Sequence, residues 1–400
     1  MHPVEDIRGV KSNRLKAKKI VLGVTGSIAA VETVKLCREL IRHGAEVIPV
    51  MTHSASKIIH PDSLWFATGY KPIVALSGKT EHVFYCGKTK KPADLLLISP
   101  CTANTVSKIA HGIDDTPVTT FATTAIGSKI PVILVPAMHV SMYSNKIIQR
   151  NIKICKQNNI DLIEPKIEGN KAKLPGVDRV VAQVFRKTGE KKLKNKKILI
   201  IGGGSSEKID NVRVISNLSS GKTAMWFSKN SYYLHGEVEL WIGQNSEMIP
   251  DYIKTKKFKT LNDLEKLIDK NNLKKYDYIF VCAALSDYIP VKQKGKIKSD
   301  KNKINLELKK ATKIINSIRK HAPNSVIIGF KMEDDKKLVK QESMKLLKNN
   351  NLNFVVGNTT KAFDNDSNEI WLFNKKGIVF HKKDSKENLT NHIIKSVIKQ

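Results

Sequence analysis

Two clusters of glycine and hydroxyl residues, each directly after an apolar run, give this chain its best candidates for phosphate binding. The first cluster is Thr25–Ser27, which follows the run Lys19–Val24. The second begins at Gly202, after Lys197–Ile201, and continues at Ser216–Gly221. Backbone N–H groups in such a turn, followed by the N-terminus of a helix, can hold an anion. The repeated arrangement predicts two nucleotide-handling domains, although neither cluster has the Gly-x-Gly-x-x-Gly spacing of a dinucleotide site.

The first half of the chain places more polar residues after its apolar runs. Thr52 and Ser54 follow one run, and the turn Pro100–Thr105, which contains Asn104, follows another. A hydroxyl and an amide in that turn are suited to binding a ligand. The alternative is structural, because Thr102 or Asn104 would also be a good cap for the next helix.

Two histidines and one cysteine of this half have side chains suited to polar contacts or proton transfer. His82 is either a base or an ordinary partly buried histidine. His139 lies in the loop Pro136–Met142, which combines methionines with polar groups. Cys101, inside the turn after the apolar run, either donates a proton or simply packs in the core.

The second half contains a run, Gly202–Lys222, that is too rich in glycine and polar residues for a structural loop of its length; the alternative is a loop without a ligand. Asp287 follows an apolar run, where a carboxylate can hold Mg²⁺ or contact a ribose or base edge. Lys296 lies in the polar segment after it. Phe330 also follows an apolar run, and its ring is suited to contact with a nucleotide base.

Apolar runs alternate with helical patterns from Lys19 onward. Because strands that alternate with helices form parallel sheets covered on both faces, the fold class is predicted to be α/β. Ligands of such sheets bind at the carboxyl ends of the strands, where the polar loops described above lie. The strands are predicted at 19–24, 45–51, 94–99 and 130–136, and the helices at 27–43 and 104–109.

The second half repeats this alternation, which predicts a second α/β unit. Its strands are predicted at 197–201, 237–242, 277–282, 326–330 and 353–356, and its helices at 220–234, 261–271, 311–320 and 335–350. The segment 289–310 is dense in lysine and too long for an ordinary connection, so it is predicted to be a functional flap.

These patterns predict four parts along the chain. Residues 1–18 are polar and lysine-rich, so they are predicted to be an N-terminal tail. The segment 187–196 has almost no apolar residues and is predicted to be a basic linker. The two domains are therefore expected to span 19–186 and 197–400.

The composition of the 400 residues predicts a soluble, cytoplasmic protein, because 41% of them are hydrophobic and no apolar run approaches the length of a membrane span. The net charge of +32 raises nucleic-acid binding as an alternative. However, the lysines are spread along the chain without an RNA-binding motif, so neither nucleic acid nor membrane is an expected partner. The five scattered cysteines predict neither disulfides nor a structural zinc site.

The polar residues of the first half, taken in order, resemble the flavin-containing cysteine decarboxylases over about residues 19–185. The resemblance rests on Gly26-Ser27, the isolated His82, the Pro-x-x-Ala-Asn-Thr turn at 100–105 and the Pro-Ala-Met-x-x-x-Met loop at 136–142. It implies a flavodoxin- or Rossmann-like three-layer domain that forms trimers and binds FMN. The residues that it assigns to FMN binding are Gly26, Ser27, Thr52, Ser54, Ser99 and Thr105.

In that family the flavin oxidises the thiol-bearing carbon of a cysteinyl substrate, and the resulting thioaldehyde lets CO₂ depart. The resemblance assigns the base to His82 and a carboxylate-holding role to Asn104. This chain departs from the family twice: His139 stands where family members have a carboxylate-binding asparagine, and residues 168–176 lack the cysteine that protonates the enethiol. Cys101 is the candidate substitute for that cysteine. The alternative is a flavoprotein of other substrate, such as a flavin prenyltransferase.

The second half resembles the phosphopantothenate–cysteine ligases over about residues 197–381. The segments that carry the resemblance are Gly202–Lys222, Ala283–Pro290, Gly329–Glu333, Val355–Asn358 and Phe363–Glu369. In that family, CTP activates the carboxylate of 4′-phosphopantothenate as an acyl cytidylate, and the amine of cysteine then displaces CMP.

The ligase resemblance implies a C-terminal Rossmann-like domain and roles for particular residues. It puts Asn217 against the acyl intermediate. The residues that it assigns to CTP are Asp287, Lys296, Thr312, Lys313, Ile314, Ile315, Phe330, Lys345 and Lys348. Lys296 is also assigned to catalysis, and Asp287 to Mg²⁺.

Together the two resemblances indicate a bifunctional enzyme of coenzyme A biosynthesis. Its ligase domain would join 4′-phosphopantothenate to cysteine, and its flavin domain would decarboxylate the product to 4′-phosphopantetheine. Trimeric flavin domains joined to dimeric ligase domains imply a dodecamer of identical chains. The sequence leaves open whether the nucleotide is CTP or ATP.

Overall fold

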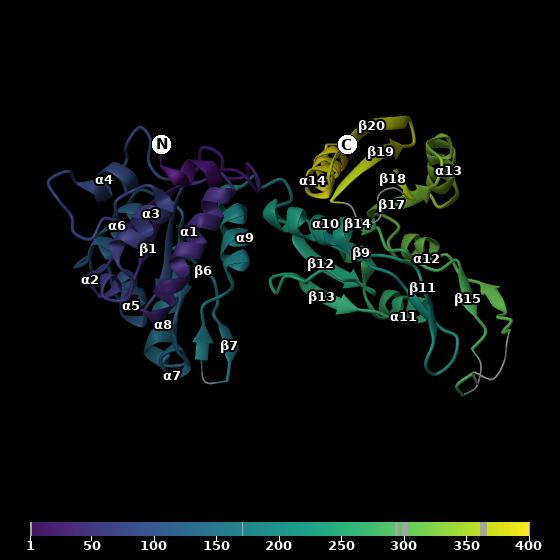
Figure 1. The fold of residues 1–400 in the computed structure, drawn as a ribbon, viewed down its shortest axis with the longest axis horizontal. Coiled ribbons are helices and arrows are strands. Elements are labelled where there is room, and N and C mark those ends of the chain that lie inside the picture. The colour runs from purple at the N-terminus through teal and green to yellow at the C-terminus, as the bar shows by residue number, and fades with distance from the viewer. Residues whose placement is uncertain (1, 170, 293–294, 298–302, 361–365, 400) are drawn as a thin grey trace. The chain divides into compact units, whose positions relative to one another are not determined.

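The computed structural model describes residues 2–169, 171–292, 295–297, 303–360 and 366–399. Parts of the predicted flap (293–294 and 298–302) and of the ligase segment at 363–369 therefore lie outside the described residues. The chain divides into two compact units, of which unit 1 spans Met1–Gly189 and unit 2 spans Glu190–Gln400 (Figure 1). Each unit has its own central sheet and its own hydrophobic core, so each is a separate α/β domain.

Unit 1 is built on a five-stranded parallel sheet with the order β2-β1-β3-β4-β6. Almost every residue of β1 to β4 is buried, as expected for an apolar sheet between two helical layers. The strands are β1 Lys19–Val24, β2 Glu46–Met51, β3 Leu95–Cys101, β4 Val132–Pro136 and β6 Asp161–Leu162. A smaller sheet joins β5 Met138–His139, β8 Lys171–Lys173 and β7 Lys166–Glu168.

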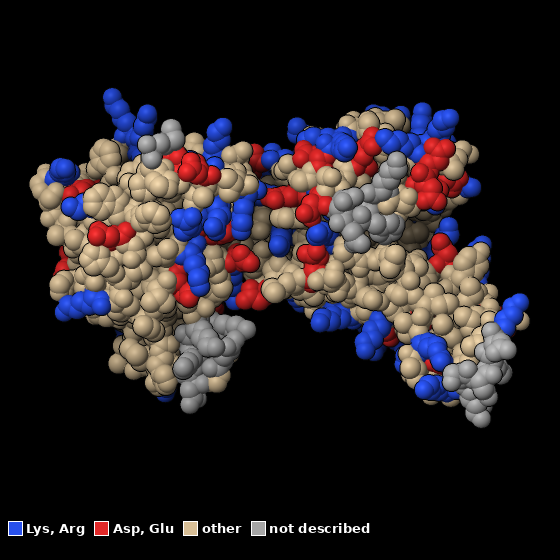
Figure 2. All heavy atoms as spheres, viewed as in Figure 1, with Lys and Arg blue, Asp and Glu red and all other residues tan. Residues whose placement is uncertain are grey.

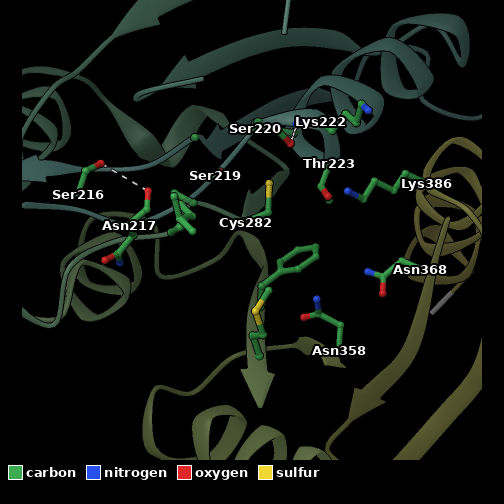
Figure 3. A pocket seen from close by; sticks show the side chains of 18 residues that line it. Ser216, Asn217, Ser219, Ser220, Lys222, Thr223, Cys282, Asn358, Asn368 and Lys386 are labelled. Carbon is green, nitrogen blue, oxygen red and sulfur yellow. Dashed lines mark hydrogen bonds between the residues drawn. The ribbon is translucent and has the colours of Figure 1, made fainter. Parts of the chain in front are cut away.

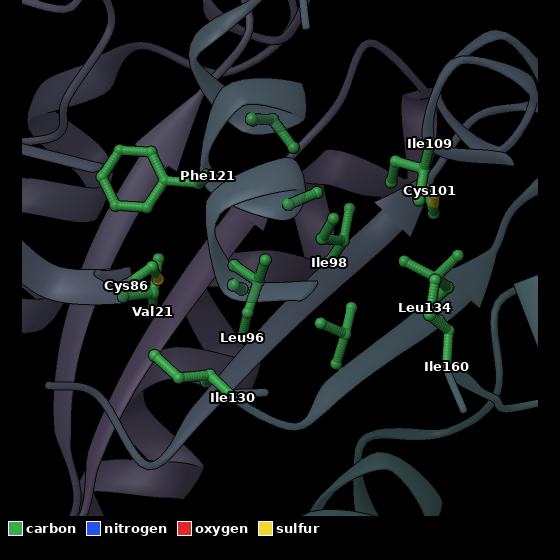
Figure 4. Close-up of a cluster of buried hydrophobic side chains, with 14 of the residues drawn as sticks. Val21, Cys86, Leu96, Ile98, Cys101, Ile109, Phe121, Ile130, Leu134 and Ile160 are labelled. Atoms are coloured by element: carbon green, nitrogen blue, oxygen red, sulfur yellow. The ribbon is translucent and has the colours of Figure 1, made fainter. Parts of the chain in front are cut away.

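The helices of unit 1 form two groups, which gives the predicted three-layer arrangement. α5, α6 and α8 pack over a cluster of buried side chains that includes Leu96, Phe121 and Ile130 (Figure 4), whereas α1, α3 and α9 pack together as the other group. The bounds are η1 Pro3–Ile7, η2 Ile28–Glu32, α1 Thr33–Arg42, α2 His53–Ser56, α3 Pro61–Thr68, α4 Glu81–Cys86, α5 Ala103–His111, α6 Pro117–Gly127, α7 Val140–Tyr143, α8 Lys146–Gln157 and α9 Val177–Thr188.

Residues 2–18 do not form the predicted tail. Leu15 is fully buried, and Val4 is 2% exposed. The Gly9 N–H donates to the Ile41 carbonyl at 3.0 Å, and the Leu15 N–H donates to the His43 carbonyl at 2.8 Å. The segment therefore packs against the end of α1. The tail prediction is wrong because the few apolar residues of the segment are scattered among polar ones and follow no regular period.

Truncating the buried Leu15 side chain is expected to destabilise unit 1. Leu15→Ala leaves a cavity in a packed interior and should lower the free energy of unfolding by about 2–5 kcal/mol. Val10→Ala is the control, because Val10 is 63% exposed and its truncation leaves no cavity. Differential scanning calorimetry of the two variants checks this, and an unchanged unit 1 transition in Leu15→Ala would mean that the segment adds nothing to the core.

Unit 2 is built on an eight-stranded sheet with the order β13-β12-β9-β14-β17-β18-β19-β20. The strands from β13 to β18 pair in parallel, whereas β19 and β20 are antiparallel additions. The bounds are β9 Lys197–Gly202, β12 Glu237–Ile242, β13 Lys254–Lys257, β14 Tyr278–Val281, β17 Val326–Glu333, β18 Phe354–Thr359, β19 Ser367–Asn374 and β20 Gly377–Ser385.

Each face of the unit 2 sheet has its own hydrophobic core, and the strands contribute side chains to both cores. On β9, Ile198 and Ile200 join the core under α10 and α14, while Leu199 and Ile201 join the core under α11, α12 and α13. This alternation is the two-residue period of a strand. The helices are α10 Lys222–Tyr233, α11 Leu261–Lys270, η3 Leu273–Lys275, α12 Ile314–His321, α13 Lys336–Asn349 and α14 Lys386–Ile398.

Two further pairs of strands lie beside each other near the carboxyl end of β14 (Figure 1). The first is the hairpin of β10 Ser206–Lys208 and β11 Val214–Ser216. The second joins β15 Tyr288–Pro290 to β16 Leu308–Lys310, at the two ends of the predicted flap.

The predicted basic linker at 187–196 is also structured where it meets unit 2. Leu193 is 1% exposed within the unit 2 core, and its N–H donates to the Leu234 carbonyl at 2.8 Å. At the other end, α9 continues to Thr188. Leu193 and the ion pairs of Glu190 and Lys196 therefore attach this segment to unit 2, although the boundary between the units, at Gly189–Glu190, does fall within the predicted linker.

Among the described residues, no helix is both long enough and apolar enough to cross a membrane. On the face shown in Figure 2, lysines and arginines are interspersed with acidic residues rather than gathered into one patch. The excess of basic residues is therefore spread over that face.

Candidate active sites

Unit 1 has a cavity of about 400 Å³ at the carboxyl ends of its strands. Its walls come from the loops after β1, β2, β3 and β4, and include the point between β1 and β3 where the strand order reverses. Open α/β sheets bind ligands at this position. The cavity is thus the candidate active site of unit 1.

A network of hydroxyl groups joins two of the loops around this cavity. The Thr25 Oγ1 donates to the Pro100 carbonyl at 2.8 Å and accepts from the Thr102 N–H at 3.0 Å. Thr102 in turn caps α5, and its Oγ1 lies 3.0 Å from the Thr105 Oγ1. The loops after β1 and β3 are therefore held in a fixed relation, with hydroxyl groups lining the cavity.

The loops after β1 and β2 approach each other at Gly26. A Cβ at this position would lie 2.5 Å from the Ser54 Cβ, so only glycine fits without a shift of the chain. Ser27 caps η2 and Thr52 caps α2, so these loops also present hydroxyl groups at helix starts. Such an arrangement of N–H and O–H donors is suited to a phosphate.

The structure brings most of the predicted residues of the first half to this cavity. Those that line it are Gly26, Ser27, Thr52, Ser54, Asn104 and Thr105. Lys108 and Thr116 line it from outside the polar loops that the sequence singled out, whereas Thr25, Thr102, Met138 and Met142 belong to those loops but had no individual role. Lys108 had a usable signal, because it follows Asn104 by one helical turn and so shares its face of α5.

Ser99 and Cys101 do not line the cavity. Ser99 is a strand residue within the predicted range 94–99, and Cys101 is one because β3 runs two residues past its predicted end. Ser99 instead faces a small separate cavity beside Leu174 and Pro175. Cys101 is fully buried in the hydrophobic core (Figure 4), and burial raises the pKa of its thiol well above the usual range. The structure therefore gives no support to the assignments of Ser99 to FMN and of Cys101 to proton donation.

Replacing Cys101 with serine is expected to leave the decarboxylation rate unchanged. The thiol is buried in the core and donates weakly to the Thr102 carbonyl at 4.0 Å, so its loss removes no side chain from the cavity; the buried hydroxyl should instead lower stability by about 1–3 kcal/mol. Release of CO₂ by Cys101→Ser, measured at a temperature well below its unfolding transition, checks this. A selective loss of enethiol reduction in a folded variant would restore Cys101 as the donor.

The two candidate histidines, His82 and His139, do not line the cavity that a single chain forms. His82 is on α4, half-buried, with its ring 6.4 Å from that of Phe121 in an edge-on arrangement. Its Nδ1 is buried and has no hydrogen-bond partner among the residues that the structure describes. His139 is exposed and caps α7, with its Nδ1 2.7 Å from the Ser141 Oγ.

Unit 2 has a larger cavity, of about 530 Å³, again at the carboxyl ends of the strands (Figure 3). It lies where the strand order reverses between β9 and β14, and it is closed by residues from β17, β18, β19 and the first residue of α14. Phe330 and Asn217, both predicted, line it. This cavity is the candidate active site of unit 2.

Glycines shape the part of this cavity next to Asn217. Gly203 has a φ of +76°, and a Cβ at Gly204 would lie 2.7 Å from the Asn217 carbonyl oxygen. Gly221, with a φ of +77°, directly precedes α10. A side chain at Gly204 would displace the loop that carries Asn217, and side chains at Gly203 and Gly221 would meet the segment 243–245, so the glycine-rich sequence serves a close approach of backbone segments.

One end of the unit 2 cavity gathers positive charge and polar groups. Lys386 is 7% exposed, and in Figure 3 it points with Thr223, Asn358 and Asn368 toward a common space. Lys222, at the start of α10, pairs with Asp366 at 2.7 Å. None of these five residues was assigned a role from the sequence.

A thiol lies in the wall of the same cavity. The Cys282 Sγ donates to the Ile201 carbonyl at 3.5 Å, and burial raises the pKa of this thiol to about 12. Cys282 is therefore neutral at physiological pH and contributes an uncharged surface.

Several residues predicted to contact CTP do not line this cavity. Asp287, Lys296, Lys345 and Lys348 are exposed, and Lys345 lies 3.6 Å from Glu342 on its own helix. In the stretch from Thr312 to Ile315, Thr312 and Lys313 are exposed and Lys313 caps α12. Ile314 is buried in the core and Ile315 packs against it, so neither of these two side chains is available to a ligand.

The two units define a two-domain α/β protein with a cavity at the carboxyl ends of the strands in each domain. The family called Flavoprotein matches residues 9–189, and the family called DNA/pantothenate metabolism flavoprotein C-terminal domain matches residues 193–400. Unit 1 is accordingly a flavoprotein domain, which supports a flavin as its cofactor.

Similar proteins extend over the whole chain. A coenzyme A biosynthesis bifunctional protein CoaBC from Thermococcus kodakarensis is 40% identical, with 99% of each chain covered. The protein of the same name from Methanocaldococcus jannaschii is 39% identical over 100% of this chain and 98% of its own, and that from Borreliella burgdorferi is 33% identical over 96% and 99%. The chain belongs to this family of bifunctional coenzyme A biosynthesis proteins.

Proposed function

We propose that unit 2 joins 4′-phosphopantothenate to cysteine with CTP, and that unit 1 decarboxylates the product to 4′-phosphopantetheine with FMN. The observation that carries the proposal is the full-length similarity to bifunctional coenzyme A biosynthesis proteins. A separate cavity in each unit supports two independent sites for the two reactions.

The ligation proposed for unit 2 has two steps. A carboxylate oxygen of 4′-phosphopantothenate attacks the α-phosphorus of CTP, and pyrophosphate leaves. The amine of cysteine then attacks the acyl carbon, an amide forms and CMP leaves. In this scheme the Asn217 amide donates to the acyl oxygen as negative charge develops on it. The ring of Phe330 contacts the cytosine base of CTP, and the ammonium group of Lys296 pairs with the phosphates of CTP.

The charge of the unit 2 cavity supports an anionic substrate. Lys386 contributes a positive side chain and the N-terminus of α10 a partial positive charge, whereas the charge of Lys222 is compensated by Asp366. Thr223, Asn358 and Asn368 add hydrogen-bond donors at the same end. This end is suited to the phosphate of 4′-phosphopantothenate.

Mg²⁺ is proposed to reach this site with the nucleotide. Asp287 is an exposed carboxylate after β14 and is the proposed protein ligand. The described residues include no cluster of three or more histidines, cysteines or carboxylates that would hold a metal by itself. The remaining ligands are therefore expected to be triphosphate oxygens and water, the usual situation for this ion.

The unit 1 cavity fits the phosphate and ribityl chain of FMN. Because Gly26 has no side chain, the loops after β1 and β2 lie close together there. Ser27, Thr52 and Ser54 line the cavity beside it, and Thr105 adds another hydroxyl. When bound, the flavin supplies a reversible two-electron oxidation of the thiol-bearing carbon of the substrate.

The chain's own residues supply the remaining groups for decarboxylation. His82 is the proposed base that takes a proton from the substrate. Asn104 donates a hydrogen bond to the substrate carboxylate until CO₂ leaves, and His139 is proposed to assist it.

Self-association is part of the proposal, with trimeric flavin domains and dimeric ligase domains giving a dodecamer. Support comes from α3 and α4, where Trp65, Phe66, Val83 and Phe84 are between 43% and 60% exposed. Large apolar side chains in such numbers are typical of a surface that another chain covers.

A cytoplasmic location is also proposed, because all five cysteines are free thiols.

One incubation tests both activities. Purified protein is mixed with 4′-phosphopantothenate, cysteine, CTP and Mg²⁺, and the products are weighed by mass spectrometry. The full reaction yields 4′-phosphopantetheine, ligation alone yields the carboxylated adduct, and replacing CTP with ATP measures the nucleotide preference. Absence of any adduct would contradict the ligase assignment, and a preparation that binds no FMN would contradict the decarboxylase assignment.

A further inference from the structure

Asp210, at the tip of the β10–β11 hairpin, is a fully buried carboxylate. Its Oδ1 accepts from the Val212 N–H at 2.7 Å and from the Arg213 N–H at 2.6 Å. Its Oδ2 accepts from the Arg213 Nη1 at 2.6 Å and from the Ile297 N–H at 3.0 Å. The last of these bonds joins the hairpin to a segment that is more than eighty residues away in the sequence.

Two more hydrogen bonds strengthen this connection. The Arg213 Nη1 donates to the Ile297 carbonyl at 3.1 Å, and the Asn211 N–H donates to the Gly295 carbonyl at 3.2 Å. The backbone is therefore held on both sides of Lys296. The side chain of Lys296 itself is exposed. These contacts therefore fix the position of its backbone and do not involve its ammonium group.

The Asp210 carboxylate is well suited to this role because it stays ionised. The N–H groups of Val212, Arg213 and Ile297, together with the Arg213 guanidinium, hold its pKa far below the usual range. Hydrogen bonds to a charged acceptor are stronger than those between neutral groups, and their loss would leave buried donors without a partner.

The same hairpin leads directly to the cavity of unit 2. After Arg213, strand β11 runs from Val214 to Ser216, and the next residue is Asn217. The Ser216 Oγ donates to the Ser205 carbonyl at 3.0 Å, which ties this end of the hairpin to the loop after β9. One rigid hairpin therefore connects Asn217 at its base with the Lys296 backbone at its tip.

We infer that Asp210 is a positioning residue for ligation, which sets the place of Lys296 relative to Asn217 so that the lysine meets the triphosphate. This inference rests on the proposed function, in which Lys296 binds the nucleotide. Asp210 itself touches no substrate in this arrangement.

The test measures binding of CTP with Mg²⁺ to the full-length protein by titration calorimetry. Asp210→Asn is expected to weaken this binding by about tenfold to a hundredfold, the usual effect of losing buried hydrogen bonds to a charged group. The same variant should retain its decarboxylation rate. Arg213→Gln, which keeps the carboxylate but removes its guanidinium partner, should weaken binding in the same direction.

Asp277→Asn is the matched control for the loss of a carboxylate. Asp277 accepts from the Lys197 N–H at 2.8 Å and pairs with Lys196 at 2.9 Å, at the start of β9 rather than at its carboxyl end. Its replacement should lower thermal stability without changing the affinity for CTP. An equal loss of affinity in both variants would mean that Asp210 is only structural.

A double-mutant cycle separates the inference from the proposed function. If Lys296→Gln alone does not weaken CTP binding, the assumed role of Lys296 is wrong. If Lys296→Gln weakens binding, and Asp210→Asn has no further effect in the Lys296→Gln background, the two residues are energetically coupled, as the inference requires. Full additivity of the two effects would overturn the inference while leaving the role of Lys296 intact.

Discussion

Replacing His82 with asparagine is expected to lower the rate of decarboxylation by roughly 10²–10⁴-fold, the usual contribution of a positioned general base. The physical reason lies in the Nδ1 atom, which is buried and has no hydrogen-bond partner in the described part of the chain. A buried nitrogen without a partner is costly in a purely structural histidine. Ligation by unit 2 should continue at its normal rate.

The measurement is CO₂ release from supplied 4′-phosphopantothenoylcysteine, with pyrophosphate release as the readout of ligation. His60→Asn is the matched control, because the His60 side chain is 74% exposed and asparagine can also cap the start of α3. An active His82→Asn variant would exclude His82 as the base. Loss of both activities would instead argue against independent sites.

The sequence predicted the parallel core of both units well, because buried parallel strands are continuous apolar runs. The bounds of β1 and β12 agree with the predicted ranges 19–24 and 237–242. The antiparallel strands β19 and β20 were not predicted. At this edge of the sheet β19 buries only Ile370, Leu372 and Phe373, and β20 has no fully buried residue, so their apolar signal is weak.

The candidate sites were predictable where a polar loop directly follows a strand. Gly26, Asn104 and Asn217 satisfy that condition or lie in the same glycine-rich loop, and all three line cavities. Lys386 could not be found in this way, because it reaches the unit 2 cavity from the start of α14, which tertiary packing alone brings there. Cys101 was misplaced because the end of β3 was predicted two residues too early.

Replacing Asn217 with alanine is expected to lower the rate of ligation by roughly 10²–10³-fold, the usual effect of removing one donor to a developing oxyanion. The backbone of Asn217 is held by the close approach of Gly204 and by the hairpin before it, so its amide starts from a fixed position at the cavity. Because alanine keeps the same backbone conformation, the unit should stay folded. Decarboxylation of supplied 4′-phosphopantothenoylcysteine should not change.

The assay is CTP-dependent release of pyrophosphate, together with the amount of adduct formed. Asn388→Ala provides the comparison, because Asn388 is an exposed residue of α14 in the same unit and lies outside the cavity. Because the oxyanion develops in the second step, Asn217→Ala should release pyrophosphate normally but form the amide slowly, and slow pyrophosphate release would instead place Asn217 in the first step. Normal rates of both steps in Asn217→Ala would mean that the acyl oxygen is stabilised elsewhere, for which the Lys386 end of the cavity offers the nearest positive charge.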